Sequence, residues 1–280
     1  MTKILKTIEE LQDFVRNIKK SGNSVGFVPT MGALHEGHLT LARTALKNCD
    51  ACIVSIFVNP KQFAPHEDFD RYPRMMDKDT ALLRTIGVDA VFAPDVETMY
   101  PIGYQTTVTV GEVSKPLEGE FRPTHFAGVA TVVARLLLLV GADKAFFGEK
   151  DYQQLQVITQ MATDLAIPTK IVGVPIVREE SGLALSSRNA YLSGQEKKIA
   201  DQLNVVLFAM ADELKAGTDI AHIEKNAAQK LLDLGFDSID YCTIRDAKTL
   251  MPPTAETKAR RILAAVKLGK TRLIDNIAAN

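Results

Sequence analysis

Residues 24–38 of the chain read SVGFVPTMGALHEGH, and this segment predicts a β-strand followed directly by an α-helix. Ser24 to Val28 is short and mostly apolar, whereas apolar residues recur at helical spacing over 39–46. The histidines His35 and His38 therefore fall at or near the N-terminus of the helix. Backbone N–H groups and the positive end of the helix dipole attract anions there, and an imidazole adds a donor. We predict a nucleotide phosphate site.

Two other interpretations of this histidine pair are a solvated helix start and a zinc site. Gly32 and Gly37 allow close approach of a ligand, and the next apolar run, Ile53 to Val58, completes a strand-helix-strand unit. Ligands bind at the carboxyl ends of such strands, so this context favours the phosphate site. Zinc remains a minor alternative. The two histidines of the metalloprotease motif are four residues apart, whereas His35 and His38 are three apart, and the remaining histidines of this chain stand alone: His66, His125 and His222.

The composition is that of an ordinary globular protein. The 280 residues are 46% hydrophobic and 24% charged, enough for one large and one smaller domain. A formal net charge of -1, without a Lys/Arg block, indicates neither nucleic acid nor a membrane surface as partner. Met1 to Phe14 lacks the apolar core of a signal peptide, and the longest apolar run, Leu136 to Val140, cannot span a bilayer. We expect a cytoplasmic protein with small-molecule partners.

The chain has three cysteines, a number that agrees with a reducing compartment. Cys49 and Cys52 form a C-x-x-C pattern, but they close a helix and enter a strand, whereas redox pairs open a helix. Cys242 is the one other thiol, which is too few for a four-cysteine zinc site. We expect Cys49 and Cys52 to be small buried hydrophobic side chains.

Strand and helix patterns alternate along the first part of the chain. Beyond Ile53 to Val58, the sequence predicts helices over 77–86, 129–140 and 152–165, and strands over 88–93, 144–147 and 169–174. Such alternation is typical of a parallel sheet covered by helices on both faces. We therefore predict an α/β fold with a doubly wound, Rossmann-like parallel sheet.

The pattern changes beyond Val177, where a polar segment over 178–187 begins. The sequence then predicts helical stretches over 194–215 and 219–234, and strands over 239–244 and 261–266. We predict a large domain over residues 1–177 and a smaller α+β domain over 178–280.

Two common nucleotide motifs are missing. No Gly-x-Gly-x-x-Gly occurs, so the dinucleotide fingerprint is absent. Gly269-Lys270-Thr271 is similar to the end of a P-loop, but the first glycine position is Ala264 and too little chain follows. We predict that this segment is a turn between two terminal strands.

Five separated motifs occur in the order and spacing of the pantothenate synthetase family, which the chain resembles along essentially its whole length. They are PTMGALHEGH (29–38), FVNPKQF (57–63), YPR (72–74), FGEKD (147–151) and LSSRN (185–189). His35 to His38 also resembles the His-Ile-Gly-His signature of the wider nucleotidyltransferase superfamily, shared with class I aminoacyl-tRNA synthetases. Ser186-Ser187-Arg188 resembles the place of their second, lysine-containing signature.

The resemblance implies ATP-dependent condensation of pantoate with β-alanine. Pantoate would attack the α-phosphorus of ATP to give an enzyme-bound pantoyl adenylate and pyrophosphate, and the β-alanine amine would then expel AMP. Adenylation is needed because a carboxylate has only oxide as a leaving group. Attack at phosphorus mainly requires charge neutralisation and alignment, so no serine or cysteine nucleophile is needed. The resemblance also implies Mg²⁺ with the ATP, and a homodimer.

The resemblance assigns ATP binding to three segments, with His35, His38 and Lys150 as catalytic residues and His38 as the family's proton donor. Lys150 would act as a point charge on the phosphates. The segment over 178–187 would link the domains and act as a lid. The ATP-binding residues implied are Met31, Gly32, Ala33, Leu34, His35, Glu36, Gly37, His38, Gly148, Glu149, Lys150, Asp151, Val177, Leu185, Ser186, Ser187 and Arg188.

Gln62 and Gln154 match the family's substrate contacts to pantoate. Neutral amides suit a carboxylate that must stay nucleophilic, because a lysine there would lower its reactivity. Mg²⁺ would be held mostly by phosphate oxygens and water. Asp79 is a candidate carboxylate near it, but no metal ligand is assigned.

Two other functions are kept as alternatives. One is a non-catalytic nucleotide-binding regulator, and the joint presence of Gln62, Gln154, Lys150 and both motif histidines argues against it. The other is the zinc hydrolase implied by a metal site at His35 and His38.

Overall fold

A six-stranded parallel sheet forms the first part of the chain in the computed structural model, which describes residues 2–64 and 69–279. Its strands are β1 (Lys3–Leu5), β2 (Val25–Thr30), β3 (Ala51–Ile56), β4 (Ala90–Phe92), β5 (Lys144–Gly148) and β6 (Lys170–Val174). They lie in the order β1-β4-β3-β2-β5-β6, and all pairs are parallel. The chain builds outward from β2 on one side and from β5 on the other, so the winding direction changes between these two strands. The predicted doubly wound sheet is confirmed.

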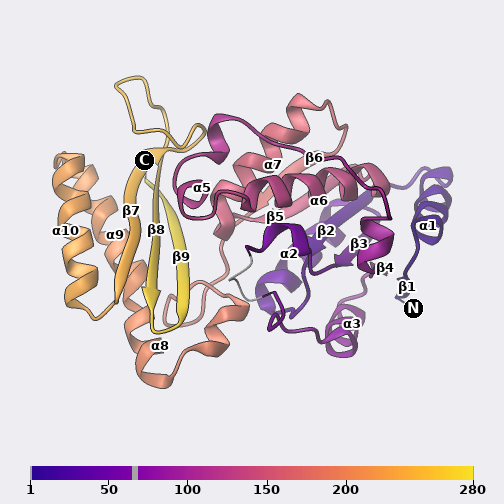
Figure 1. Ribbon diagram of the computed structural model, residues 1–280, viewed down its shortest axis with the longest axis horizontal. Coiled ribbons are helices and arrows are strands. Elements are labelled where there is room, and N and C mark those ends of the chain that lie inside the picture. The colour runs from indigo at the N-terminus through magenta and orange to yellow at the C-terminus, as the bar shows by residue number, and fades with distance from the viewer. Residues whose placement is uncertain (1, 65–68, 280) are drawn as a thin grey trace.

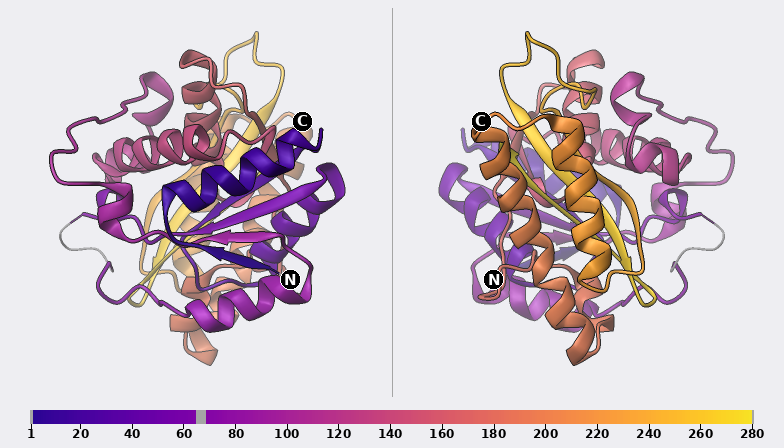
Figure 2. Two further views of the ribbon diagram at one scale, coloured as in Figure 1. Left: turned by 90° about the vertical axis from the view of Figure 1, so that its right-hand side faces the viewer. Right: turned by 90° about the vertical axis from the view of Figure 1, so that its left-hand side faces the viewer.

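Helices cover both faces of this sheet. Successive side chains of a strand point to opposite faces, and the apolar side chains on each face pack against a separate group of helices. Phe27 packs with one group of helices, and its neighbour Val28 packs with the other. Figure 2 shows α1 and α3 on opposite faces. The first group is α1 (Ile8–Lys20), α6 (His125–Val140) and α7 (Tyr152–Asp164), and the second is α2 (Glu36–Asn48) and α3 (Met76–Thr85).

The helix α6 is apolar nearly all round and lies in the centre of the first core. The sequence predicted it to begin at Val129, but it begins one turn earlier at His125. Throughout the described part of the chain, no helix is both long and apolar enough to cross a bilayer.

The C-terminal part is a second, smaller assembly of helices and strands. Its helices are α8 (Gly194–Ala200), α9 (Gln202–Lys215) and α10 (Ile220–Asp233), and its antiparallel strands are β7 (Ser238–Asp246), β8 (Arg260–Leu268) and β9 (Thr271–Ala279). Figures 1 and 2 show α9 and α10 across the outer face of this sheet. Leu207, Leu231 and Ile262 belong to the hydrophobic core between them. The predicted α+β character of this region is confirmed.

Short helices complete the connections. Two of them are α-helical, α4 (Val96–Met99) and α5 (Glu118–Phe121). Four are 3-10 turns: η1 (Pro60–Gln62), η2 (Glu112–Ser114), η3 (Glu149–Asp151) and η4 (Ser187–Tyr191).

The structure contains elements that the sequence patterns did not predict. The strand β1 has three residues, too few to show a period, and it is defined by its pairing with β4. The helix α1 begins at a capping box, in which Thr7 and Glu10 bind each other's backbone N–H groups, and Thr-x-x-Glu was a usable signal. The stretch predicted as one helix over 194–215 is α8 and α9, separated at Asp201, which keeps helical dihedral angles.

The turn predicted at Gly269 is confirmed. It joins β8 to β9, and Gly269 has a φ of 58°, the left-handed region in which glycine has no steric penalty.

The interpretation of Cys49 and Cys52 as buried hydrophobic side chains is also confirmed. Cys49 ends α2, Cys52 lies in β3, and both are free thiols. Burial raises the pKa of both thiols, so they stay protonated.

Candidate active site

The loops that follow β2 and β5 flank the point at which the sheet changes its winding direction. The two strands are parallel neighbours, so their carboxyl ends open on the same crevice. His35 and His38 lie in the first loop and at the start of α2, and Lys150 lies in the second. Burial is the main cause that lowers the pKa of His35, and the positive charge of the nearby Lys150 lowers it further. The structure thus brings together the first two predicted ATP segments.

The two histidines are oriented by backbone donors at the start of α2. Nδ1 of His35 accepts from the N–H of Gly37 at 3.2 Å, and Nδ1 of His38 accepts from the N–H of His35 at 3.4 Å. Their ring centroids are 4.1 Å apart. Burial, followed by the charge of His35, lowers the pKa of His38 to about 3, so His38 is neutral at neutral pH. With Nδ1 accepting, each neutral ring carries its proton on Nε2, where it can donate to an anion.

The predicted loop residues Ala33 and Leu34 have backbone N–H groups that face the protein. They donate to Oδ2 and Oδ1 of Asp79 at 2.8 and 2.9 Å, and Asp79 is 1% exposed. Gly32 has a φ of 86°, a conformation that favours glycine. Asp79, the candidate carboxylate near Mg²⁺, therefore stabilises the loop with both oxygens. With both of these N–H groups bound to Asp79, we expect the imidazoles of His35 and His38 to be the donors that this loop offers to an anion.

A cavity of about 690 Å³ lies between the parallel-sheet part and the C-terminal sheet. Basic residues outnumber acidic ones in its lining by seven to four, which suits an anionic ligand. Of the predicted site residues, those that line it are Lys150, Asp151, Gln154, Ser186 and Arg188. Those outside its lining are Met31 to His38, Gln62, Gly148, Glu149, Val177, Leu185 and Ser187.

The third predicted segment is anchored to the C-terminal sheet. The N–H of Leu185 donates to the carbonyl of Val177 at 3.0 Å, so the two ends of the segment between them are hydrogen-bonded to each other. Arg178 makes two hydrogen bonds, of 2.7 and 2.9 Å, to the buried carboxylate of Asp275 in β9. Ser186 is the N-cap of η4, and its hydroxyl accepts from the N–H of Arg188 at 3.2 Å.

Of the two predicted pantoate glutamines, Gln154 lines the cavity and Gln62 lies outside its lining. Gln62 ends η1, and its Nε2 lies 3.1 Å from Sδ of Met31, next to the histidine loop. Gln154 lies in α7 and lines the cavity. The preceding residue, Gln153, is 3% exposed and structural, because its amide binds the N–H of Glu118 at 3.0 Å and two carbonyl oxygens.

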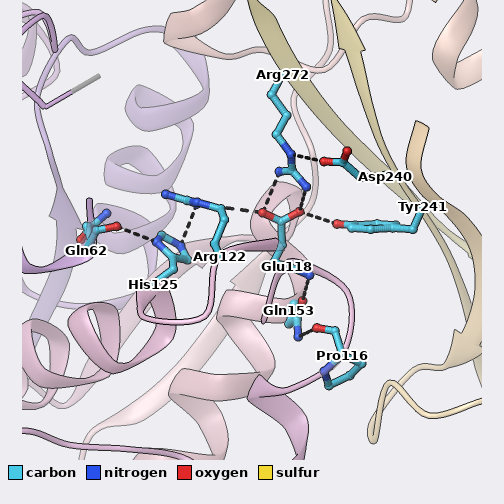
Figure 3. A network of polar contacts seen from close by, with 9 residues as sticks. All are labelled: Gln62, Pro116, Glu118, Arg122, His125, Gln153, Asp240, Tyr241 and Arg272. Carbon is cyan, nitrogen blue, oxygen red and sulfur yellow. Dashed lines mark hydrogen bonds and ion pairs between the residues drawn. The ribbon is translucent and has the colours of Figure 1, made fainter. Parts of the chain in front are cut away.

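Glu118 is the centre of a polar network that the sequence analysis missed (Figure 3). Its carboxylate accepts two hydrogen bonds from Arg272, at 2.7 and 2.8 Å, and one from the Tyr241 hydroxyl at 2.7 Å. Asp240 binds the other side of the same guanidinium at 2.7 Å. Burial opposes ionisation of Glu118, but the hydrogen bonds and charge of Arg272 outweigh it and lower its pKa.

The network continues from Glu118 to Gln62 (Figure 3). Nη1 of Arg122 lies 4.0 Å from the Glu118 carboxylate and 3.1 Å from Nε2 of His125. A guanidinium can only donate, so Nε2 of His125 accepts, and its protonated Nδ1 donates to the Gln62 carbonyl at 3.0 Å. No sequence motif marked the residues of this network. Charged and polar residues of these types are common on protein surfaces, and the partners of Glu118 in the C-terminal sheet are known only from the fold.

The zinc interpretation finds no support in the geometry. His66 lies outside the described residues, and His125 binds Arg122 and Gln62. Within residues 2–64 and 69–279, no group of three or more His, Cys, Asp or Glu side chains is placed to hold a metal ion.

The open parallel sheet with helices on both faces and the smaller antiparallel C-terminal sheet define a Rossmann-like α/β protein. Residues 3–278 match the family model of pantoate-beta-alanine ligase. The chain belongs to the pantoate-beta-alanine ligase family, which confirms the resemblance seen in its motifs.

The relatives cover nearly the whole chain. It is 52% identical to the pantothenate synthetase of Paramagnetospirillum magneticum, over 98% of this chain and 96% of the relative. The crystal structure of pantothenate synthetase from Thermus thermophilus superposes with a TM-score of 0.94 at 45% identity, over 99% of both chains. The pantoate-beta-alanine ligase of Francisella tularensis, complexed with beta-gamma ATP and beta-alanine, has a TM-score of 0.84 at 34% identity, over 100% of this chain and 98% of that one.

Proposed function

We propose that the chain condenses pantoate with β-alanine to pantothenate, using ATP and releasing AMP and pyrophosphate through a pantoyl adenylate. The observation that carries the proposal is the pairing of the His35–His38 loop with the Lys150 loop at the switch point of the sheet. The cavity beside them is rich in basic residues, as polyphosphate binding requires. Family membership supplies the particular substrates, since a relative of the same fold was solved with beta-gamma ATP and beta-alanine.

In this proposal the histidines stabilise by hydrogen bonding, and Lys150 by its positive charge, the negative charge that develops as pantoate attacks the α-phosphorus. His38 donates its Nε2 hydrogen as a neutral imidazole, and Lys150 supplies a positive charge from the neighbouring loop. Ser186 and Arg188 line the same cavity and suit the leaving pyrophosphate, for which the planar guanidinium offers paired donors. The other predicted ATP-binding residues of the three segments complete the ATP site in this proposal.

Gln62 and Gln154 bind pantoate in this proposal. An amide can hold a carboxylate or hydroxyl oxygen without the full charge that would lower the nucleophilicity of the carboxylate. Gln62 approaches from the histidine loop, and Gln154 approaches from the cavity wall. The adenylate would therefore form where the two loops meet.

The proposal includes Mg²⁺ bound to the ATP phosphates. The described residues include no cluster of ligands for a metal ion, so Mg²⁺ would arrive with ATP and be held mainly by phosphate oxygens and water. When bound, it would neutralise phosphate charge.

We also propose the domain organisation that the sequence pattern predicted, with the domain roles that the family resemblance implied. Residues 1–177 form the nucleotide- and pantoate-binding domain, and residues 178–280 form a C-terminal lid domain, linked by the segment over 178–187. This division is supported by separate hydrophobic cores on the two sides. A cytoplasmic homodimer is part of the same proposal, and light scattering at micromolar concentration tests it, with a monomer mass as the contrary result.

Isotope exchange tests the proposed reaction. Pantoate alone, without β-alanine, is expected to drive exchange of labelled pyrophosphate into ATP, because adenylate formation is reversible on the enzyme. Omission of pantoate is the control and should abolish exchange. Formation of ADP, or no exchange with pantoate present, would rule out the adenylate mechanism.

A further inference from the structure

Asn59 is a buried amide whose four hydrogen-bonding positions are all used. It precedes η1 and is 1% exposed. Its Nδ2 donates to Oε1 of Gln62 at 3.1 Å and to the carbonyl of Gly128 at 3.2 Å. Its Oδ1 accepts from the Tyr100 hydroxyl at 2.8 Å and from the N–H of Lys61 at 3.3 Å. An amide has two donors and two acceptor positions, so Asn59 is saturated.

The orientation of this amide follows from its two backbone partners. The carbonyl of Gly128 can only accept, so Nδ2 of Asn59 must face it. The N–H of Lys61 can only donate, so Oδ1 must face that side. The second hydrogen of Nδ2 then points to Gln62, and the free lone pair of Oδ1 points to the Tyr100 hydroxyl, which must donate.

The orientation of Asn59 fixes that of Gln62 in turn. Because Nδ2 of Asn59 is a donor, the atom of Gln62 that meets it is the acceptor Oε1. The Nε2 group of Gln62 then points away from Asn59, toward the side of Met31 and the histidine loop. One hydrogen of Nε2 is donated to Sδ of Met31, and the other remains as the donor for a ligand, so Gln62 selects a hydrogen-bond acceptor.

We infer that Tyr100 is a positioning residue for pantoate: its hydroxyl holds Asn59 firmly in the orientation that the backbone partners define, and Asn59 thereby keeps Gln62 turned as a donor toward an oxygen acceptor of the substrate. The inference rests on the proposed function, because it takes Gln62 as a pantoate contact. The partner of Gln62 is then a carboxylate oxygen or the lone pair of a hydroxyl oxygen. A reversed amide would instead place its own oxygen against the substrate carboxylate, which is repulsive.

The surroundings of Tyr100 suit this role. Burial is the main cause that raises the pKa of Tyr100, and the neighbouring Tyr104 raises it further. The hydroxyl of Tyr100 therefore keeps its proton and remains a donor. The ring is held by Phe57 and Tyr104, with centroid distances of 6.1 and 5.1 Å. The backbone of η1 is held as well, because Gly128 lies so close that a Cβ there would be 2.2 Å from the Lys61 carbonyl oxygen. The hydroxyl of Tyr100 therefore meets Asn59 at a fixed place.

The same site provides a matched control. Tyr104 stacks on Lys61 as Tyr100 does, with Nζ at 4.4 Å from the Tyr104 centroid and 4.6 Å from that of Tyr100. Only the hydroxyl of Tyr100 is bonded to Asn59. Tyr100→Phe thus removes the hydrogen bond and keeps the ring, whereas Tyr104→Phe removes a neighbouring hydroxyl that is not bonded to Asn59.

The test measures kcat and the KM values of pantoate and ATP for both variants and for Gln62→Ala with and without Tyr100→Phe. Tyr100→Phe is expected to raise the pantoate KM roughly three- to tenfold, the range that one hydrogen bond supplies, with the ATP KM unchanged. Tyr104→Phe is expected to leave both KM values unchanged. In the Gln62→Ala background, Tyr100→Phe should have no further effect, because the group it orients is gone.

Two results would overturn the inference alone. One is an unchanged pantoate KM in Tyr100→Phe, and the other is an equal rise in the presence and absence of Gln62, which a general packing defect would give. If Gln62→Ala itself leaves the pantoate KM unchanged, the assignment of Gln62 in the proposed function fails, and this inference fails with it. The exchange of pyrophosphate driven by pantoate tests the reaction independently of either residue.

Discussion

The carboxylate of Glu118 and the guanidinium of Arg272 are 154 positions apart in the sequence and are joined by two hydrogen bonds of 2.7 and 2.8 Å. Glu118 begins α5 in the parallel-sheet part, and Arg272 lies in β9 of the C-terminal sheet. Both line the cavity, so this pair fixes the distance between its two walls. Bidentate pairs of this kind are directional, which suits a contact that sets geometry.

Arg272→Gln is expected to lower the free energy of unfolding by about 3 kcal/mol, because it leaves the Glu118 carboxylate buried without its main cation. Urea denaturation measures this. The control is Lys115→Gln, which removes an exposed ion pair with Glu112 and should change stability by less than about 0.5 kcal/mol. Equal effects of the two variants would contradict the role of Glu118 as a buried link.

Lys150→Ala and His38→Ala are each expected to lower kcat by about a hundredfold or more, with smaller effects on the KM of ATP. Donors placed where charge develops act mainly on the transition state. Lys144→Ala is the matched control, since Lys144 lies at the opposite end of β5 and bonds the carbonyl of Asn48. Near-native kcat in both site variants, with normal folding, would show that the phosphate assignment is wrong.

Gln153 and Gln154 are adjacent, and we expect substitution of Gln153 to change the stability of the protein and substitution of Gln154 to change the KM of pantoate. Gln153→Ala removes hydrogen bonds to one N–H and two carbonyl groups in a buried site, so it should destabilise the protein by about 2 kcal/mol. Gln154→Ala should leave stability unchanged and raise the pantoate KM, because this side chain lines the cavity. Thermal unfolding and steady-state kinetics on both variants measure this. A pantoate-specific defect in Gln153→Ala alone would reverse the assignment.

Acid is expected to destabilise the protein through His38. Its pKa is lowered from 6.5 to about 3 in the folded state, so between these values the unfolded chain binds more protons. Stability is therefore complete above pH 6.5 and is lost as the pH falls toward 3, by up to roughly 1 kcal/mol per pH unit for this group. Urea denaturation between pH 7 and 5 should show a shallower pH slope for His38→Gln than for the wild type. Identical slopes would contradict the burial of a neutral imidazole.

The sequence by itself determined the class of the fold and the loops that carry the site. Apolar strands alternating with amphipathic helices have few stable arrangements, and the parallel sheet with helices on both faces is the one that buries all of them. The position of His35 and His38 followed from the local change from strand to helix after Val28. The five motifs identified the family, because each is a short local stretch that can be read from the sequence and because the five occur together in the order and spacing of that family.

Local patterns were insufficient where an element depends on a distant partner. The strand β1 is too short to have a period and exists because it pairs with β4. The strand β9 follows a turn that the sequence predicted, but its length of nine residues is set by its pairing with β8. The backbone N–H groups of Ala33 and Leu34 bind the carboxylate of Asp79, and only the fold brings these residues together.

The cavity and its polar links were decided by tertiary structure alone. Glu118 meets Arg272 and Tyr241 only after the C-terminal sheet has docked, and no spacing in the sequence encodes these two contacts. Likewise, the orientation of the Gln62 amide depends on its hydrogen bond with Asn59. Residue types and local periods determine where strands, helices and phosphate loops form, whereas hydrogen-bond direction and desolvation of distant charges are defined only when the layers come together.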